Sequence, residues 1–135
     1  MEPVDVKALR ERAFVTMASL ASTGAEMIAA ERGRQQGVEG WTPEHDDEHL
    51  PGELSAASRA YSLFAWWQIG RDADGGRSGW SREMCEEIIL RDFWPWDERD
   101  WKPSDDPERN LVKAGALIAA EIDRLQRATS REQAR

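Results

Sequence analysis

"GELSAASRAYSLFAWWQIG", residues 52–70, is the stretch that decides the fold, because as a helix it is apolar on nearly every side. A helix that is hydrophobic all round belongs in the interior of a protein. Pro51 suits the first turn of such a helix, Glu53 lies near its positive N-terminal end, and Gly70 marks its end. The stretch is therefore predicted to be the central, most buried helix.

Two more helices are predicted upstream of this stretch. Residues 4–21 carry apolar side chains at loosely helical spacing, which is typical of an amphipathic helix. Thr23 and Glu26 form a capping box at the start of a second helix, which covers about residues 24–36. Gly37 is expected to end that helix as a left-handed cap.

Two further helices are predicted downstream, separated by an irregular segment. Ser81 can cap a short helix over residues 82–91. The segment 92–109, "DFWPWDERDWKPSDDPER", is too rich in Pro and Trp for a regular element. Asp106 and Pro107 within it open the last helix, which is predicted to reach about residue 128. The apolar positions of this last helix recur every three or four residues, at Leu111, Gly115, Ile118, Ile122 and Leu125.

The whole pattern predicts an all-α fold, a compact bundle of four to five helices with a long irregular loop rich in Trp and Pro. No stretch shows the alternation of a β-strand. At 135 residues the chain is expected to form one domain. This domain is predicted over residues 1–128, with 1–22 as an added N-terminal helix, 71–79 as a flexible connection and 129–135 as a flexible tail.

Composition excludes some classes of function. The net charge of -8 argues against general binding to DNA or RNA, which requires a basic surface. An acidic surface fits a metal-dependent site, a basic protein partner or simple solubility. Cys85 is the only cysteine and cannot form an internal disulfide. No apolar run is long enough for a membrane span, and the N-terminal residues do not resemble a signal peptide, so the cytoplasm is the expected location.

The stretch "EGWTPEHDDEH", residues 39–49, combines two histidines with many carboxylates. Asp46 and Asp47, together with His49 and Glu53, offer the ligand types that a divalent cation needs. Carboxylates favour Mg²⁺ or Mn²⁺, whereas a histidine ligand favours Mn²⁺ or Zn²⁺. The alternative is that one aspartate caps a helical turn and that the histidines are exposed to solvent.

The second predicted helix carries an unusual polar face. At 100° per residue this face holds Ile28, Glu31, Arg32 and Gln35. One interpretation is an exposed stripe or an internal ion pair. The other is the polar wall of a pocket that continues into residues 39–49, which follow directly in the sequence.

The irregular loop contains a rigid aromatic motif. Trp94 and Trp96 flank a proline, and Lys102 follows them. Rigid aromatic side chains either fill a core or stack on a ligand. They are therefore interpreted either as a plug at the end of the bundle or as a stacking wall over residues 39–49.

The last helix holds one carboxylate that needs a partner. Glu121 lies at the edge of the apolar face, and a partly buried carboxylate is costly without a partner. Lys113, Arg32 or a backbone cap could supply it. A salt bridge within the bundle is the simplest interpretation.

Catalytic motifs are incomplete. In size, acidity and helix content the chain resembles the all-α nucleoside triphosphate pyrophosphohydrolases, a resemblance that implies a Mg²⁺ site of Glu-x-x-Glu on one helix and Glu-x-x-Asp on the next. Glu83 and Glu86 form one such pair, but no Glu-x-x-Asp follows on a later helix. Cys85 lies beside carboxylates that would raise the pKa of its thiol. The sequence therefore favours binding over catalysis.

Three motifs resemble the signature of a family of small uncharacterised phage and prophage proteins. They are "AAERGRQQGVEGWTPEHDDEHLPGEL" at 29–54, "WPWDERDWKP" at 94–103 and "LVKAGALIAAEIDRL" at 111–125. The resemblance covers roughly residues 26–62 and 93–127, and it implies a phage context more than a chemistry. The "GW" followed by an acidic pair is also similar, over a short stretch, to ryanodine-receptor repeat domains. That second resemblance implies a pocket for a nucleotide-type ligand.

Two functions are therefore predicted as alternatives. The favoured one is a phage- or prophage-type accessory protein that binds a host or defence component, or a nucleotide-like ligand, through an acidic, Trp-rich face. The other is a divalent-metal-dependent nucleotide (pyro)phosphohydrolase of the all-α type, with Asp46 and Asp47 as ligands of Mg²⁺ or Mn²⁺. A homodimer through the last helix remains open. The candidate residues for a ligand or partner are Glu31, Arg32, Gln35, Trp41, His49, Glu53, Trp94, Trp96, Lys102, Lys113 and Glu121.

Overall fold

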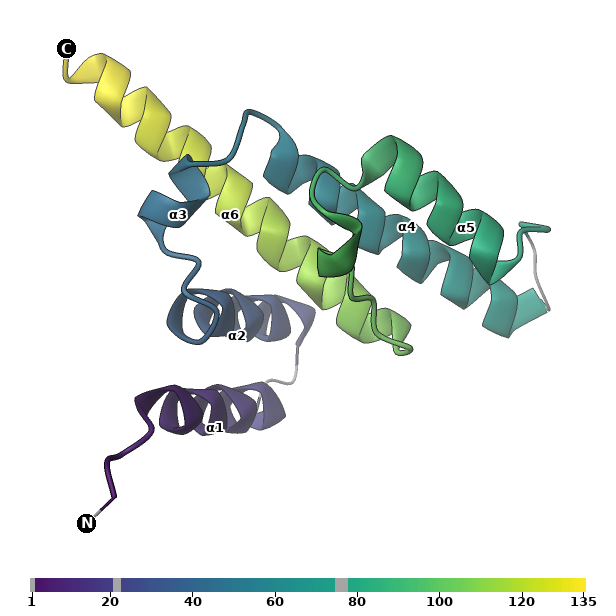
Figure 1. Ribbon diagram of the computed structural model, residues 1–135, viewed down its shortest axis with the longest axis horizontal. Coiled ribbons are helices and arrows are strands. Elements are labelled where there is room, and N and C mark those ends of the chain that lie inside the picture. The colour runs from purple at the N-terminus through teal and green to yellow at the C-terminus, as the bar shows by residue number, and fades with distance from the viewer. Residues whose placement is uncertain (1, 21–22, 75–77) are drawn as a thin grey trace.

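α-Helices build the described part of the chain, residues 2–20, 23–74 and 78–135 of a computed structural model (Figure 1). No strand occurs within these ranges, which confirms the predicted all-α fold. A π-helical turn, Ile89–Phe93, and a 3₁₀ turn, Glu98–Asp100, interrupt the segment between the last two helices. The helices are α1 (Val6–Leu20), α2 (Gly24–Gly37), α3 (Pro43–Asp47), α4 (Glu53–Asp74), α5 (Arg82–Ile88) and α6 (Pro107–Gln133).

The central helix is α4, as predicted, although it continues past Gly70 to Asp74. It packs against α6 and also contacts α5 and the π-helical turn (Figure 1). Phe64 at its centre is fully buried. The other core side chains that α4 contributes include Leu54, Ala57, Ala60, Tyr61 and Trp67.

Helix α6 packs on α4 through small side chains. Ala114, Leu117 and Ala120 are buried in the core, and the Ser58 hydroxyl donates a 2.9 Å hydrogen bond to the Ala114 carbonyl oxygen. Small residues allow two helix backbones to approach closely enough for such a bond. The large side chains of the predicted apolar stripe lie on another face of α6. They are between 43% and 52% exposed, at Leu111, Ile118, Ile122 and Leu125.

The predicted helix starts are confirmed by their caps. The side chains of Thr23, Ser81 and Asp106 accept hydrogen bonds from backbone N–H groups in the first turns of α2, α5 and α6. The end of α2 differs from the prediction, because Gly37 stays in the helix. Gly40 instead has the left-handed conformation, with a φ of 75°. The chain therefore turns three residues later than expected, just before α3.

The irregular loop is held at the start of α6 by a buried amide network. Asn110 donates hydrogen bonds of 2.8 Å to the Gln68 side-chain oxygen and to the Ser104 carbonyl oxygen. Gln68 donates to the same carbonyl at 3.0 Å, and the Ser104 N–H donates to Asn110 at 2.8 Å. Buried polar groups that satisfy one another in this way fix a unique loop position.

The two ends of the chain differ in their packing. Helix α1 lies beside α2, with Val6 and Leu9 exposed (Figure 1). Helix α6 continues to Gln133 rather than ending near residue 128. The predicted connection 71–79 begins in α4, and its residues 75–77 lie outside the described ranges. Within those ranges no helix is long and apolar enough to cross a bilayer.

Candidate functional site

A cavity of about 590 Å³ opens between α2, α3, α4, α6 and the irregular loop. Its size lies within the range typical of small-molecule sites, roughly 300–1,000 Å³. Its walls come from segments that are distant in the sequence, so only the folded chain assembles it. The residues that line it are Glu31, Arg34, Gln35, Glu39, Trp41, His45, His49, Leu54, Tyr61, Trp94, Trp96, Asp100, Lys102, Lys113 and Leu117.

Most of the residues predicted from the sequence meet in this cavity. Arg32 and Glu53 do not line the cavity, but Arg32 binds Asp46 and Glu53 binds Trp96. Glu121 binds Arg124 instead. The predicted residues that line the cavity are Glu31, Gln35, Trp41, His49, Trp94, Trp96, Lys102 and Lys113.

Helix α2 supplies a charged wall that is already neutralised. The Glu31 side chain is buried, and it accepts a 2.9 Å hydrogen bond from Arg34 and pairs with Arg109 of α6. Burial raises the pKa of Glu31, but the hydrogen bonds from the two arginines outweigh burial and hold it below its usual value. Arg34 also pairs with Glu39 at 2.8 Å. Glu31 is therefore a structural anion rather than a free ligand.

Gln35 occupies the same wall but leaves a polar atom unused. Its side chain is 2% exposed, and its amide oxygen has no hydrogen-bond partner among the described residues. The backbone carbonyl of Gln35 accepts the Trp41 N–H at 2.9 Å, which fixes the start of the loop to α2. A buried acceptor without a partner destabilises a fold, so its presence in a cavity wall points to a function.

The aromatic side chains of the irregular loop divide between core and cavity. Trp94 and Trp101 pack on Tyr61 of α4, with ring centroids 5.7 Å and 4.7 Å away. Trp96 packs on His49, with centroids 4.9 Å apart. Trp94 therefore belongs to the core, whereas Trp96 is partly buried and lines the cavity beside His49. Trp41 stacks nearly parallel to His45 at 6.3 Å on the same side.

Two lysines place positive charge at the cavity. The Lys113 ammonium group donates a 3.0 Å hydrogen bond to the Lys102 carbonyl oxygen and lies 5.4 Å from the Tyr61 ring centre. Burial lowers the pKa of Lys113, and the nearby Arg109 lowers it further. The Lys102 side chain is exposed beside it. Among the described residues, neither lysine forms an ion pair with a carboxylate. Both could therefore bind an anionic group at this end of the cavity.

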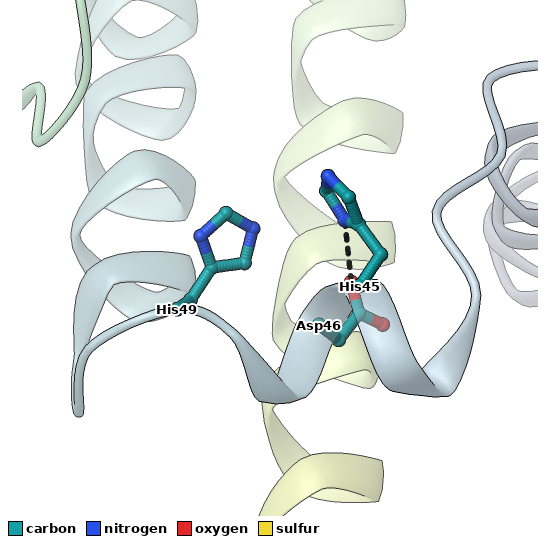
Figure 2. A group of neighbouring side chains, drawn as sticks. All are labelled: His45, Asp46 and His49. Atoms are coloured by element: carbon teal, nitrogen blue, oxygen red, sulfur yellow. Dashed lines mark ion pairs between the residues drawn. The ribbon is translucent and has the colours of Figure 1, made fainter.

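Helix α3 replaces the loop expected at residues 39–49. Thr42 caps it, accepting a 3.3 Å hydrogen bond from the His45 N–H, so the predicted aspartate cap is wrong. Asp46 is completely buried, and one of its oxygens accepts a 2.6 Å hydrogen bond from Arg32 of α2. Its other oxygen and the His45 Nδ1 lie 3.8 Å apart, and neither has a hydrogen-bond partner in the described part of the chain (Figure 2).

His49 completes a cluster with His45 and Asp46. One ligand atom from each of the three lies within 4.8 Å of the others, and both imidazoles extend from the same side of the chain (Figure 2). His49 Nδ1 lies 3.3 Å from a Glu53 oxygen, and the same oxygen accepts a 2.6 Å hydrogen bond from Trp96 Nε1. The cluster is therefore supported by groups that orient its members.

Asp47, the other predicted metal ligand, is not part of this cluster. Its carboxylate pairs with Arg127 at 2.9 Å and with Arg131, both in the last turns of α6. Hydrogen bonds from these arginines hold the pKa of Asp47 below its usual value. The potential metal ligands on and just after α3 are thus Asp46, His45 and His49. Asp47 instead links α3 to α6 through its ion pairs.

Two further predictions concern residues outside the cavity. Glu121 forms a salt bridge, and its partner is Arg124 on the same helix, at 2.6 Å. Its carboxylate also accepts a 3.3 Å hydrogen bond from the Ser55 N–H. It therefore caps the start of α4. Lys113 and Arg32, the other expected partners, bind the Lys102 carbonyl oxygen and Asp46 instead.

Cys85 is fully buried, and burial, together with Glu86, raises the pKa of its thiol to about 11, as expected for an inert cysteine.

Sequence reasoning missed several residues of the site. Arg34 is three residues after Glu31, a spacing that brings two side chains together on a helix, and this signal was available. His45 is one of the two histidines of residues 39–49, but it was not among the candidate residues. Tyr61 and Arg109 gave no local signal, because their roles depend on how α4 and α6 pack.

No protein-family model, curated protein or solved structure matches this chain, so its resemblance to phage proteins and to ryanodine-receptor repeats stays a prediction.

Proposed function

We propose that this protein binds a nucleotide-like ligand in the cavity beside α2 and α3. The observation that carries the proposal is the amide oxygen of Gln35, which is 2% exposed in the wall of that cavity and has no hydrogen-bond partner among the described residues. A donor on the edge of a base would satisfy this oxygen. Ligand sites are commonly built in this way, from a largely apolar cavity with a few polar groups that fix orientation.

The aromatic and charged groups around Gln35 fit the same class of ligand. Trp41 and Trp96 present indole surfaces on which a flat base can stack, an interaction worth about 1–3 kcal/mol per base. Lys102 and Lys113 supply charge for a phosphate. Two of the carboxylates in the lining are already paired with arginines, Glu31 with Arg34 and Arg109 and Glu39 with Arg34.

A panel of nucleosides and nucleotides tests the proposal by thermal shift and calorimetry. Binding of a nucleotide should raise the melting temperature, and Lys113→Met should weaken binding of the phosphorylated ligand more than that of its nucleoside. Lys7→Met, on the exposed surface of α1, is the matched control and should change neither. The absence of any shift across the panel would refute a nucleotide pocket.

Catalysis remains the alternative, and it is not favoured. A metal-dependent hydrolase would draw on the carboxylates of Glu31, Asp46, Asp47 and Glu53. Arginines engage the first three, and Glu53 binds Trp96 and His49. Turnover of a nucleotide with Mg²⁺ or Mn²⁺ that disappears in an Asp46→Ala, Asp47→Ala double variant, shown by circular dichroism to be folded, would establish the hydrolase instead.

A protein partner is the other form of the binding hypothesis. An acidic, Trp-rich surface suits a basic partner, as expected for a phage- or prophage-type accessory protein that engages a host or defence component in the host cytoplasm. If no nucleotide binds, a pull-down from a host lysate with wild-type protein and a Trp41→Ala variant is the test of this form. A partner lost only from the variant would support it.

We also propose a homodimer through the outer face of α6. Ile118, Ile122 and Leu125 follow the four and three spacing of a coiled-coil seam and, like Leu111, are about half exposed. Gly115 is not part of this outer face, because it lies against Ile28 of α2. Val112, Ala119 and Gln126 flank one side of this seam without charge. On the other side, Glu121 is already paired with Arg124. Ile122→Asp should convert a dimer to a monomer in light scattering, whereas Leu50→Asp, another exposed leucine, should not. A monomeric wild type would contradict the dimer.

A further inference from the structure

His45, Asp46 and His49 bring three potential metal ligands together at the edge of the cavity, on and just after α3 (Figure 2). We infer that this cluster binds a transition-metal cation of the Zn²⁺ type, with two imidazoles and one carboxylate as ligands. The inference does not depend on the proposed nucleotide ligand, because the metal site is defined by the protein's own side chains.

Asp46 provides the strongest observation. Its side chain is completely buried, and Arg32 occupies only one of its two oxygens, at 2.6 Å. The other oxygen faces the His45 ring at 3.8 Å, too far for a hydrogen bond, and has no hydrogen-bond partner among the residues described. A buried carboxylate oxygen and a buried imidazole nitrogen that face each other in this way can both be satisfied by one cation between them.

The surrounding groups resemble the outer shell of a metal site. A metal-bound histidine usually donates its other N–H to a carboxylate, which fixes the tautomer and the ring orientation. His49 Nδ1 lies 3.3 Å from Glu53, which leaves Nε2 to accept a metal. Glu53 is itself held by Trp96, and Asp46 by Arg32. Two of the three ligands therefore have a supporting partner.

The donor set of two imidazoles and one carboxylate favours zinc over the magnesium that a purely carboxylate site would bind. Imidazole nitrogens suit zinc and other first-row transition metals, whereas Mg²⁺ prefers oxygen ligands. Zinc binds nitrogen at about 2.0–2.1 Å, so the donors, up to 4.8 Å apart, would close slightly around the ion. Three protein ligands leave a fourth position open. His45 and His49 line the cavity, so this position would face it.

Titration with Co²⁺ and with Zn²⁺ alone, after dialysis against a chelator, tests the site directly. Wild-type protein should bind one equivalent of Co²⁺, with visible absorption bands typical of low coordination number, and Zn²⁺ should displace it. His45→Ala and His49→Ala should each weaken binding at least tenfold. Because Asp46→Asn would also break the pair with Arg32, the histidine variants are the decisive ones.

Matched controls separate this site from other ligands on the chain. Asp47→Asn changes the neighbouring carboxylate, which binds arginines instead, and Cys85→Ser removes the only thiol. Both should bind Co²⁺ as the wild type does. Failure of the wild type to bind one equivalent, or undiminished binding by both histidine variants, would overturn the inference. Since no nucleotide is present in these titrations, their failure is distinguishable from failure of the nucleotide proposal.

Discussion

Arg32 and Asp46 join α2 to α3 through a buried ion pair, at 2.6 Å, with little of either side chain exposed. Removal of one partner from such a pair leaves an uncompensated charge or polar group in the interior and typically costs about 3–5 kcal/mol. Arg32→Met should therefore lower the free energy of unfolding by about 3 kcal/mol or more, as measured by urea denaturation at neutral pH.

A neighbouring ion pair supplies the control for this prediction. Arg131 is largely exposed where it pairs with Asp47, and exposed pairs contribute about 0–1 kcal/mol. Arg131→Met should accordingly change stability by no more than this small amount. Equal losses for Arg32→Met and Arg131→Met would show that the buried pair has no special role.

Cys85 is predicted to be unreactive in the folded protein. Its side chain is fully buried, and burial raises the pKa of the thiol to about 11, so little thiolate forms at pH 8. A thiol-specific reagent should react slowly with the native protein and quickly in urea. Fast reaction without denaturant would mean that α5 opens readily.

At this scale the sequence predicted which polar residues matter better than it predicted their partners. Helix periodicity alone predicts that Glu31, Arg32 and Gln35 share a face of α2, whereas the burial of this face is visible only in the structure. The spacing of Arg124 three residues after Glu121 was a local signal for their ion pair, but the contact of Glu121 with α4 was not predictable in the same way. Its contact with the Ser55 N–H depends on the start of α4 lying beside α6, which no local pattern encodes.

Among the elements, the contact of α2 with α6 depends on a glycine. A Cβ atom at Gly115 would lie 2.5 Å from Ile28 Cδ1 and 2.8 Å from its Cγ1, closer than carbon atoms can approach. Gly115→Ala should therefore destabilise the protein by about 1–3 kcal/mol through overpacking, less the gain of up to about 1 kcal/mol from better helix propensity.

A double variant shows whether this clash is the cause. Ile28→Ala combined with Gly115→Ala removes the atoms that collide, so the two changes should be less costly together than their separate losses predict. Gly24→Ala, where a Cβ would meet no atom within 4 Å, should show no clash. Strict additivity of the first two changes would mean that α2 and α6 are not in tight contact at this point.

Helix starts were predictable because caps are local, whereas the orientation of α6 was not. Thr23, Ser81 and Asp106 each bond within the next few residues, so their roles are visible in the sequence. The two apolar faces of α6 differ mainly in side-chain size, and the smaller one packs on α4. Only the geometry of α4 decides between them. The π-helical turn before Trp94 likewise gave no sequence signal.

For the whole molecule, acid stability should depend on Glu31. Hydrogen bonds from Arg34 and Arg109 hold the pKa of Glu31 below its value in the unfolded chain, although burial opposes them. A carboxylate whose pKa is lowered by folding stabilises the native state above the unfolded pKa, about 4.3, and this contribution is lost as the pH falls below that value.

Glu31→Gln should flatten the loss of stability below about pH 4.3, relative to the wild type, because it removes this titrating group. Urea denaturation at a series of pH values would measure the effect. The variant should also be less stable at pH 7, where it leaves two arginines without their carboxylate. Parallel stability curves for both proteins down to pH 2 would contradict the account.

The cavity is proposed to be a binding site whose polar groups form hydrogen bonds only when a ligand is bound. A substitution at Gln35 is the sharpest test of this proposal. Because its amide oxygen has no hydrogen-bond partner in the part of the chain that the structure describes, Gln35→Met should leave the melting temperature of the free protein unchanged or higher. Calorimetry with the nucleotide that shifts the wild type most should show at least a tenfold loss of affinity for Gln35→Met and none for Gln36→Met on the exposed side of α2. Undiminished affinity in Gln35→Met would contradict the account.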